Sequence, residues 1–226
     1  MIPSDMRFIL FLTLFFVTVN RLHSQQIEFS SGLCTNSFFD GSKRDLHHYS
    51  NYDSKSGYSI SLAMNMLAID SLPLRFSLRY TDYGGAIFTT NGGVAFYTST
   101  NASVHNQCLG ADIFILNFKI KSKLNLNLGL EINYLLKEKL TGYIDVHVPP
   151  DFDTIPFDKG TIQLGNQFYG GIVARVGYEV DLSKYYYLIP QYQIFVGLTP
   201  EFDNLEMNTR SVRHYLEIGI GRRITQ

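Results

Sequence analysis

The sequence predicts an all-β protein, an eight-stranded antiparallel up-and-down transmembrane β-barrel. Apolar and polar residues alternate with a period of two in eight segments, which is typical of strands with one apolar and one polar face. The connections between these segments are alternately short and long. After residue 24 no segment has the roughly 18 apolar residues that a membrane-spanning helix needs, so a membrane protein of this sequence must be a closed barrel.

Composition and charge agree with this prediction. The 226 residues include 15 Tyr, 17 Phe and 18 Gly, which favour strands and tight turns over helices. Only 17% of the residues are charged, and the formal net charge is −1. Without a basic excess, neutralisation of phosphates cannot drive binding to DNA or RNA, so we expect no nucleic acid partner.

The N-terminal segment has the features of an export signal. Arg7 precedes an apolar run over residues 8–19, and a polar stretch follows it up to Ser24. Such a run is too short to cross a bilayer comfortably and is typical of a signal peptide. We expect residues 1–24 to be a signal peptide and residues 25–226 to form the outer-membrane barrel domain; an N-terminal membrane anchor is the alternative.

The clearest strand is 124–134, LNLNLGLEINY, in which every even position is apolar and every odd position is Asn, Gly or Glu. After Ile115 the alternation of its segment is lost, which predicts a β-bulge there. Pro190 lies inside another segment and predicts a local irregularity. The other seven segments are 27–33, 58–66, 74–81, 109–115, 168–179, 186–196 and 215–221.

The connections predict the topology. Short ones cover 68–72, 121–123 and 181–184, and long ones cover about 36–56, 84–106, 137–164 and 198–208. This pattern is typical of a barrel with short periplasmic turns and long outer loops. A ten-stranded barrel is an alternative, because 84–106 or 137–164 could hold another hairpin. A lipocalin-like barrel or a β-sandwich also alternates, but neither explains a polar face so rich in Arg and Glu.

The polar face carries five acidic and five basic residues, and all five bases are arginines. An eight-stranded barrel is just wide enough for side chains to fill it, so ten charges inside must pair with one another. Arginine offers forked, two-pronged pairing with carboxylates. We therefore predict a packed ionic network that closes the lumen rather than an open pore, made of Glu28, Arg75, Arg79, Asp112, Glu131, Arg175, Glu179, Arg213, Glu217 and Arg223.

Aromatic residues near the strand ends fit the girdles that flank the apolar band of a membrane barrel. An ordinary role within the strands is the alternative. The candidates are Tyr58, Tyr80, Tyr134, Phe168, Tyr178 and Tyr186.

The two cysteines, Cys34 and Cys108, fall at the predicted outer rim on the polar face. Exported proteins meet an oxidising compartment, so the two could form a disulfide. Strands one and four of an eight-stranded barrel lie nearly opposite, however, and a disulfide needs a Cα separation of about 6 Å. Pairing would require a loop that folds across the mouth.

No motif predicts catalysis, a cofactor or a metal. His47 and His48 with Asp45 and Asp53 lack the ligand spacing of a defined metal site. A hydrolase would need a nucleophile next to a base. His105 lies near Ser103, but the sequence shows no acid that would orient it. The other candidate bases are His47, His48, His147 and His214.

Three stretches carry a family resemblance. They are Gln25-Gln26 after the signal, 190–198 (PQYQIFVGL) and the closing 216–221 (LEIGIG). In these the chain resembles the outer-membrane β-barrel proteins common in the Bacteroidetes, the group that includes PorT. The resemblance implies an outer-membrane barrel and does not extend to a role in type IX secretion. Barrels of this kind usually end in an aromatic residue, whereas this chain ends in Arg223, Ile224, Thr225 and Gln226.

The sequence therefore favours a non-enzymatic outer-membrane barrel with a structural, adhesive or assembly role. The expected partners are outer-membrane lipid, the outer-membrane assembly machinery and a protein bound at the outer loops. The alternatives are a small membrane-embedded lipid-modifying enzyme and a secreted soluble binding barrel.

Overall fold

The structure is a computed structural model that describes residues 24–40, 48–67, 73–92, 97–148, 151–158, 165–202 and 209–224. Residues 1–23 of the predicted signal peptide, Asp45 and His47 lie outside these ranges, and Ser24, its expected last residue, begins β1. The ten strands are β1 (Ser24–Asp40), β2 (His48–Leu67), β3 (Pro73–Gly92), β4 (Tyr97–Ile120), β5 (Leu124–Val148), β6 (Asp151–Asp158), β7 (Phe168–Tyr178), β8 (Val180–Asp181), β9 (Tyr186–Gly197) and β10 (Thr209–Arg223). Among the described residues no helix is long and apolar enough to cross a membrane.

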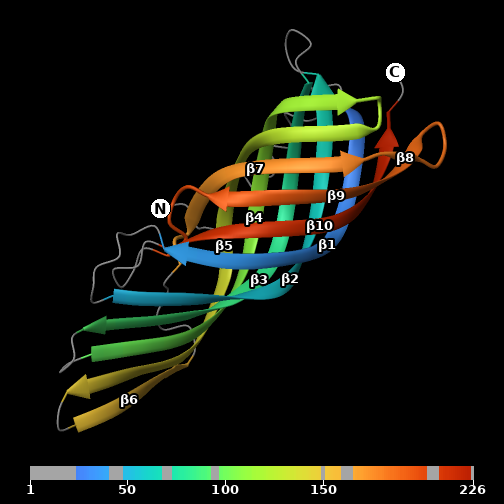
Figure 1. Ribbon diagram of the computed structural model, residues 1–226. Coiled ribbons are helices and arrows are strands. Elements are labelled where there is room, and N and C mark those ends of the chain that lie inside the picture. Colours follow the sequence, from blue (N-terminus) through green and yellow to red (C-terminus); the bar gives the residue numbers. More distant parts are fainter. Residues whose placement is uncertain are drawn as a thin grey trace, which may run out of the picture.

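Eight strands close into a ring in the order β1-β2-β3-β4-β5-β7-β9-β10, and β10 returns to β1 (Figure 1). The closing pair is antiparallel and runs from Gln26 opposite Arg223 to Asp40 opposite Thr209. Each strand pairs with the next one of the ring, which is the up-and-down topology. The predicted eight-stranded antiparallel barrel is confirmed.

Strands β2 to β5 are much longer than the membrane crossing that the sequence predicts. They have 20 to 25 residues each, and the register of β3 with β4 continues unbroken from Arg75 opposite Phe114 to Gly92 opposite Tyr97. Most of the long connections predicted at 36–56 and 84–106 is therefore strand. The prediction of loops is wrong there because alternation continues with polar outward residues in place of apolar ones.

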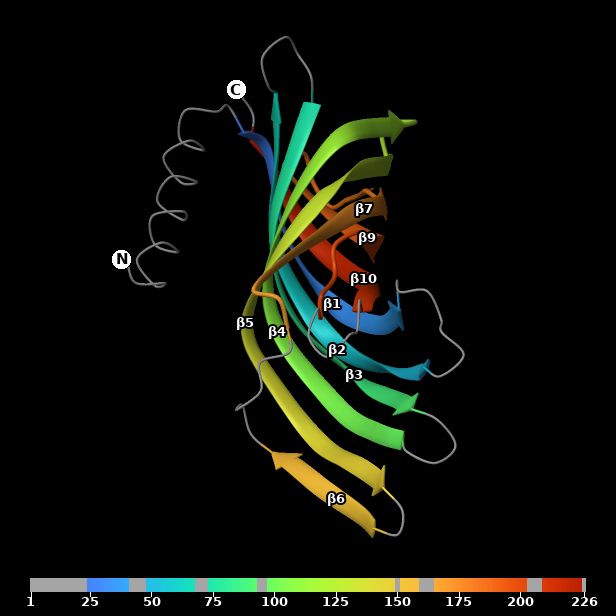
Figure 2. The ribbon, with the colours of Figure 1, turned by 90° about the vertical axis from the view of Figure 1, so that its left-hand side faces the viewer.

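The outer parts of these strands form a sheet that projects from the barrel (Figures 1 and 2). Strand β6 pairs only with the outer part of β5, from Thr141 opposite Asp158 to Val148 opposite Asp151. The connection at 137–164 thus holds an extra hairpin, but this hairpin lies outside the ring. We call β6 and the parts of β2 to β5 beyond residues 55, 84, 106 and 137 the projecting sheet.

The two faces of the barrel strands have the predicted orientation. Leu128, Leu130 and Ile132 of β5 are 44%, 50% and 59% exposed, whereas Glu131 and Asn133 are about 1% exposed. The apolar face therefore points outward and the charged face lines the lumen. This arrangement is the reverse of a lipocalin-like barrel, whose apolar face points inward.

Two local predictions concern irregular positions. The β4–β5 register shifts between Phe114 and Leu116, so the bulge predicted at Ile115 is confirmed. Pro190 pairs with Ile218 of β10 and lies where the partner of β9 changes from β7 to β8. The short turn between β4 and β5 has positive φ at Lys121 (48°) and Ser122 (61°), the geometry of a type I′ hairpin turn.

Candidate functional site: the charged lumen

The lumen contains three layers of ion pairs, and the first is centred on Glu28 of β1. Arg75 of β3 donates two hydrogen bonds to it, Nη2 to Oε1 at 2.8 Å and Nη1 to Oε2 at 3.2 Å. Arg175 of β7 brings its Nη2 to 3.0 Å from Oε1 of the same carboxylate. All three side chains are at most 4% exposed. One carboxylate thus connects three strands that are not neighbours in the ring.

Arg175 also has neutral partners in this layer. Its Nε donates to Gln191 Oε1 at 2.6 Å, and its Nη1 donates to Asn127 Oδ1 at 2.7 Å. Buried charges are tolerated when such hydrogen bonds satisfy the remaining donors.

The second layer is centred on Glu217 of β10. Its carboxylate forms an ion pair with Arg79 and accepts hydrogen bonds from Ser59 Oγ at 2.6 Å and Gln191 Nε2 at 2.7 Å. Arg79 also lies 3.5 Å from Asp112 and donates to Gln193 Oε1 at 2.8 Å. Gln191 therefore joins this layer to the one around Glu28.

The third layer is centred on Arg213 of β10, which is fully buried. Its Nη2 lies 3.7 Å from Glu131, and its guanidinium carbon lies 4.1 Å from the ring centroid of Phe195. The rings of Tyr83 and Tyr169 lie 5.0 and 5.3 Å away. Aromatic faces attract a cation, most strongly where water is excluded, so this arginine is held mainly by a cage of rings.

The barrel rim at the short turns holds Glu179 and Arg223, which form an ion pair at 2.9 Å. Lys119 lies 2.8 Å from the same carboxylate, and Arg223 also lies 2.6 Å from Asp181. Burial raises the pKa of Glu179, but hydrogen bonds from Lys119, Asn125 and Arg223 outweigh burial and hold the pKa below its usual value. The hydrogen bond from Arg223 lowers the pKa of Asp181.

The structure thus brings all ten predicted lumen residues into ion pairs, in separate layers rather than one cluster. The neutral residues that hydrogen-bond to these charges, above all Gln191 and Gln193, were not predicted from the sequence. Their signal was present, because both occupy polar positions of the alternating segment 186–196.

The outer end of the lumen is closed by a hydrogen-bonded cluster that the sequence analysis did not predict. Tyr83 and Tyr169 share a hydrogen bond of 2.8 Å between their hydroxyls. Glu201 accepts hydrogen bonds from Tyr83 and, at 3.0 Å, from Asn106. Glu201 lies in the region expected to be the loop 198–208, where its spacing gave no strand signal.

The segment that carries Glu201 lies across the mouth. Phe202 is fully buried and packs edge-on against Phe38, with ring centroids 5.3 Å apart. Asn166 donates its backbone N–H to the Glu201 carbonyl at 2.7 Å, and Phe202 forms isolated bridges with Gly165 and Thr209. The strand ends and connecting segments therefore cap the ionic layers on the outer side.

Both cysteines are buried in this cluster as free thiols, so the disulfide considered from the sequence does not form in the structure. Tyr169 donates to Cys108 Sγ at 3.0 Å, and Cys108 donates to Tyr83 at 3.6 Å. The Cys108 thiol therefore forms hydrogen bonds with one tyrosine on the neighbouring strand β3 and with one on β7.

Apolar side chains form an outward-facing belt between two sets of aromatic residues. At the end next to the projecting sheet, the tilted rings of Tyr58 and Tyr80 lie 5.9 Å apart between centroids, and those of Tyr134 and Phe168 lie 5.0 Å apart. At the end with the short turns, Tyr178 pairs with Leu124 at the start of β5, and Tyr186 pairs with Arg222. The six predicted girdle residues therefore lie at the two ends of the belt.

The geometry does not favour the hydrolase alternative. His105 and Ser103 lie on strand β4, not on a loop, and face outward. The Ser103 hydroxyl is bound by Lys55 Nζ at 2.7 Å, while His105 Nε2 lies 3.4 Å from Asp82. In the part of the chain that the structure describes, no group of three or more His, Cys, Asp or Glu residues could hold a metal ion.

Comparisons with known proteins give only remote matches. No family model matches the chain, and no curated protein does. Among solved structures, Neisserial surface protein A is 15% identical and covers 88% of this chain and 97% of its own, with a TM-score of 0.42. OprG from Pseudomonas aeruginosa is 11% identical and covers 90% of this chain and 97% of its own, with a TM-score of 0.40. Ail of Yersinia pestis is 10% identical and covers 88% of this chain and 99% of its own, with a TM-score of 0.34.

All three TM-scores are below 0.5, so these likenesses carry no conclusion about this chain. The resemblance to Bacteroidetes barrels stays a prediction.

Proposed function

We propose that this protein is an outer-membrane β-barrel that acts without catalysis, with a closed lumen and a projecting sheet that meets partners outside the cell. The observation that carries the proposal is the distribution of polarity. Apolar side chains such as Leu216 (65% exposed) and Ile218 (66%) face outward, while nine of the ten predicted lumen charges are buried in the interior. In water a continuous apolar belt of this size would be unfavourable, whereas a bilayer requires it.

The height of the belt fits a membrane. The 11 residues Phe168–Tyr178 pair along their whole length with β5. Their roughly 33 Å of strand, at a tilt of about 40°, covers about 25 Å, which is the usual height of the apolar band. The girdles lie at the two ends of this span.

The closed lumen supports a structural, adhesive or assembly role rather than transport. The ionic layers and the cluster under Glu201 fill the interior from the periplasmic rim to the mouth. The projecting sheet instead offers an exposed surface, with Phe152 and Ile155 of β6 59% and 50% exposed. A partner protein would bind there, on the outer side.

The proposal is tested by fractionation and by surface labelling. The protein should be recovered from outer membranes after a urea wash and should migrate faster on gels before boiling than after it. On whole cells, a membrane-impermeant amine reagent should modify Lys137 and Lys139 but leave Lys121 and Lys123 unmodified until the cells are opened. Recovery as a soluble periplasmic protein, or the reverse labelling pattern, would contradict the proposal.

A further inference from the structure

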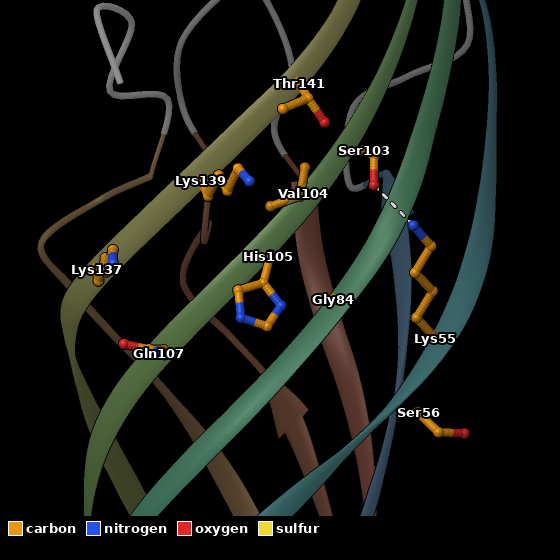
Figure 3. A pocket seen from close by; sticks show the side chains of 10 residues that line it. All are labelled: Lys55, Ser56, Gly84, Ser103, Val104, His105, Gln107, Lys137, Lys139 and Thr141. Atoms are coloured by element: carbon orange, nitrogen blue, oxygen red, sulfur yellow. Dashed lines mark hydrogen bonds between the residues drawn. The ribbon is translucent and has the colours of Figure 1, made fainter. Parts of the chain in front are cut away.

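The outward face of the projecting sheet carries a shallow pocket of about 520 Å³ next to the outer girdle (Figure 3). It crosses four strands. The strand register places Lys55, Gly84, His105 and Lys139 side by side, and it places Lys137 opposite Gln107 in the neighbouring row. Ser56, Ser103 and Thr141 complete the polar lining. The pocket therefore combines three lysines, a histidine, three hydroxyls and an amide.

Glycine at position 84 keeps the floor of the pocket open. A Cβ there would lie 2.7 Å from the backbone oxygen of Val104 and 3.7 Å from the Lys55 side chain. Any side chain would fill the hollow between β2 and β4. The lysines can therefore approach a ligand from both sides of this glycine.

The pocket has an excess of positive charge. The acid beside it, Asp82, lies 3.4 Å from His105 and accepts a hydrogen bond from Gln107 at 3.1 Å. Glu138, between Lys137 and Lys139 in sequence, points to the opposite face, where it accepts the N–H of Gly165 at 3.2 Å. Within the described ranges Lys137 and Lys139 form no ion pair, and Lys55 contacts only the neutral Ser103.

The position of the pocket decides which anion can reach it. One β-bulge separates the paired residues Gln107 and Lys137 from the paired residues Leu109 and Tyr134. Tyr134 belongs to the outer girdle. Aromatic girdles lie at the level of the lipid headgroups. The lysines are on the same outward face as the apolar belt, so they meet the headgroups of the lipids whose chains cover that belt.

We propose that this pocket binds a phosphate group of an outer-leaflet lipid. Lysine ammonium groups bind phosphate as mobile point charges, and hydroxyl and amide groups supply further hydrogen bonds. The inference rests on the proposed outer-membrane location. It adds a specific lipid contact that anchors the projecting sheet close to the membrane surface.

The test measures lipid binding to the full-length chain in neutral detergent micelles, with diphosphorylated lipid A as the probe. The variant K55Q/K137Q/K139Q should bind at least about tenfold more weakly than the unmodified protein. Enzymatically dephosphorylated lipid A should bind the unmodified protein equally weakly. The matched control K121Q/K123Q/K184Q removes three lysines at the periplasmic end and should bind within about twofold of the unmodified protein. The charge-retaining K55R/K137R/K139R should keep most of the binding.

Three results would overturn the proposal: unchanged binding by K55Q/K137Q/K139Q, equal weakening by the periplasmic control, or equally tight binding of inorganic phosphate. The last result would assign the pocket to a soluble anion instead of a lipid. The gel shift on heating checks that each variant is folded. A folded protein that fractionates with outer membranes yet shows one of these results contradicts only the lipid site, whereas a soluble protein contradicts the proposed function.

Discussion

Glu28 and Arg75 form a two-pronged ion pair inside the lumen, although β2 lies between their strands. Arg175 reaches the same carboxylate from β7 at 3.0 Å. The pair therefore fixes the distance between strands that share no backbone hydrogen bonds. A side chain in this position affects the whole cross-section of the barrel.

Glu28→Gln should destabilise the barrel by about 3–5 kcal/mol, because it leaves two buried guanidinium groups without their anion. The double variant E28Q/R75Q should be less destabilised than the sum of its single variants, since it removes one of those unpaired charges. The measurement is the urea dependence of tyrosine fluorescence in lipid vesicles, which is suitable because the chain has no Trp.

Asp53→Asn is the matched control, because Asp53 is exposed on the projecting sheet. It should change the stability by less than about 0.5 kcal/mol. If the urea midpoint of Glu28→Gln coincides with that of Asp53→Asn, the layer around Glu28 does not stabilise the barrel.

Leu128→Arg should impair assembly into membranes, because Leu128 is 44% exposed in the middle of the apolar belt. An arginine near the bilayer midplane costs about 2–4 kcal/mol. Ile155→Arg is the control, since Ile155 is 50% exposed but belongs to the projecting sheet, outside the belt. The fraction of heat-modifiable protein in isolated outer membranes should fall only for Leu128→Arg. Equal fractions of heat-modifiable protein for both variants would mean that the belt faces water and not lipid.

The layers of ion pairs and the cap over the mouth predict a barrel without an open channel. Arg213 and Glu131 are fully buried, and the Arg213 guanidinium lies against the rings of Tyr83 and Phe195, so no continuous water path is expected at this level. Purified protein in planar bilayers should show no stable conductance step. A steady, large conductance in repeated insertions is the outcome that contradicts a closed lumen.

The ion pairs of Glu179 at the short-turn rim predict a pH dependence of the stability. Glu179 has a pKa below its usual 4.5 in the folded protein, so its stabilising effect is present above the pKa of the unfolded chain and is lost as the pH falls through the folded pKa. Glu179→Gln should therefore lower the urea midpoint at neutral pH, and the midpoints of the two proteins should converge as the pH falls through the folded pKa of Glu179. A difference that persists or grows on acidification would contradict this role.

The two cysteines predict a labelling pattern. Cys34 and Cys108 are buried as free thiols, so a water-soluble maleimide should not modify the folded barrel. After unfolding without a reductant, mass spectrometry should find two labels on each chain. Unfolded chains without any label would reveal a disulfide that the structure does not contain.

The sequence by itself determined the barrel, its inside and its outside. Residues 124–134 alternate so strictly that only one register places every leucine on one face and Glu131 on the other. A one-residue slip would move the whole apolar set into the lumen, so the pattern is a direct consequence of the two-residue period of a strand. The number of strands, the bulge at Ile115 and the ten lumen charges follow from the same period.

Only the tertiary structure decided which charges pair and where the strands end. Arg75 and Arg175 lie 47 and 147 residues from Glu28 in the chain. The three side chains meet in the lumen only because the ring closes. The strands continue beyond the belt with polar outward residues such as Asn101, Ser103 and His105, so the pattern of outward apolar residues does not show where they end. The cap formed by Glu201 and Phe202, and the basic pocket around Gly84, depend on contacts between segments far apart in the chain, for which no local pattern exists.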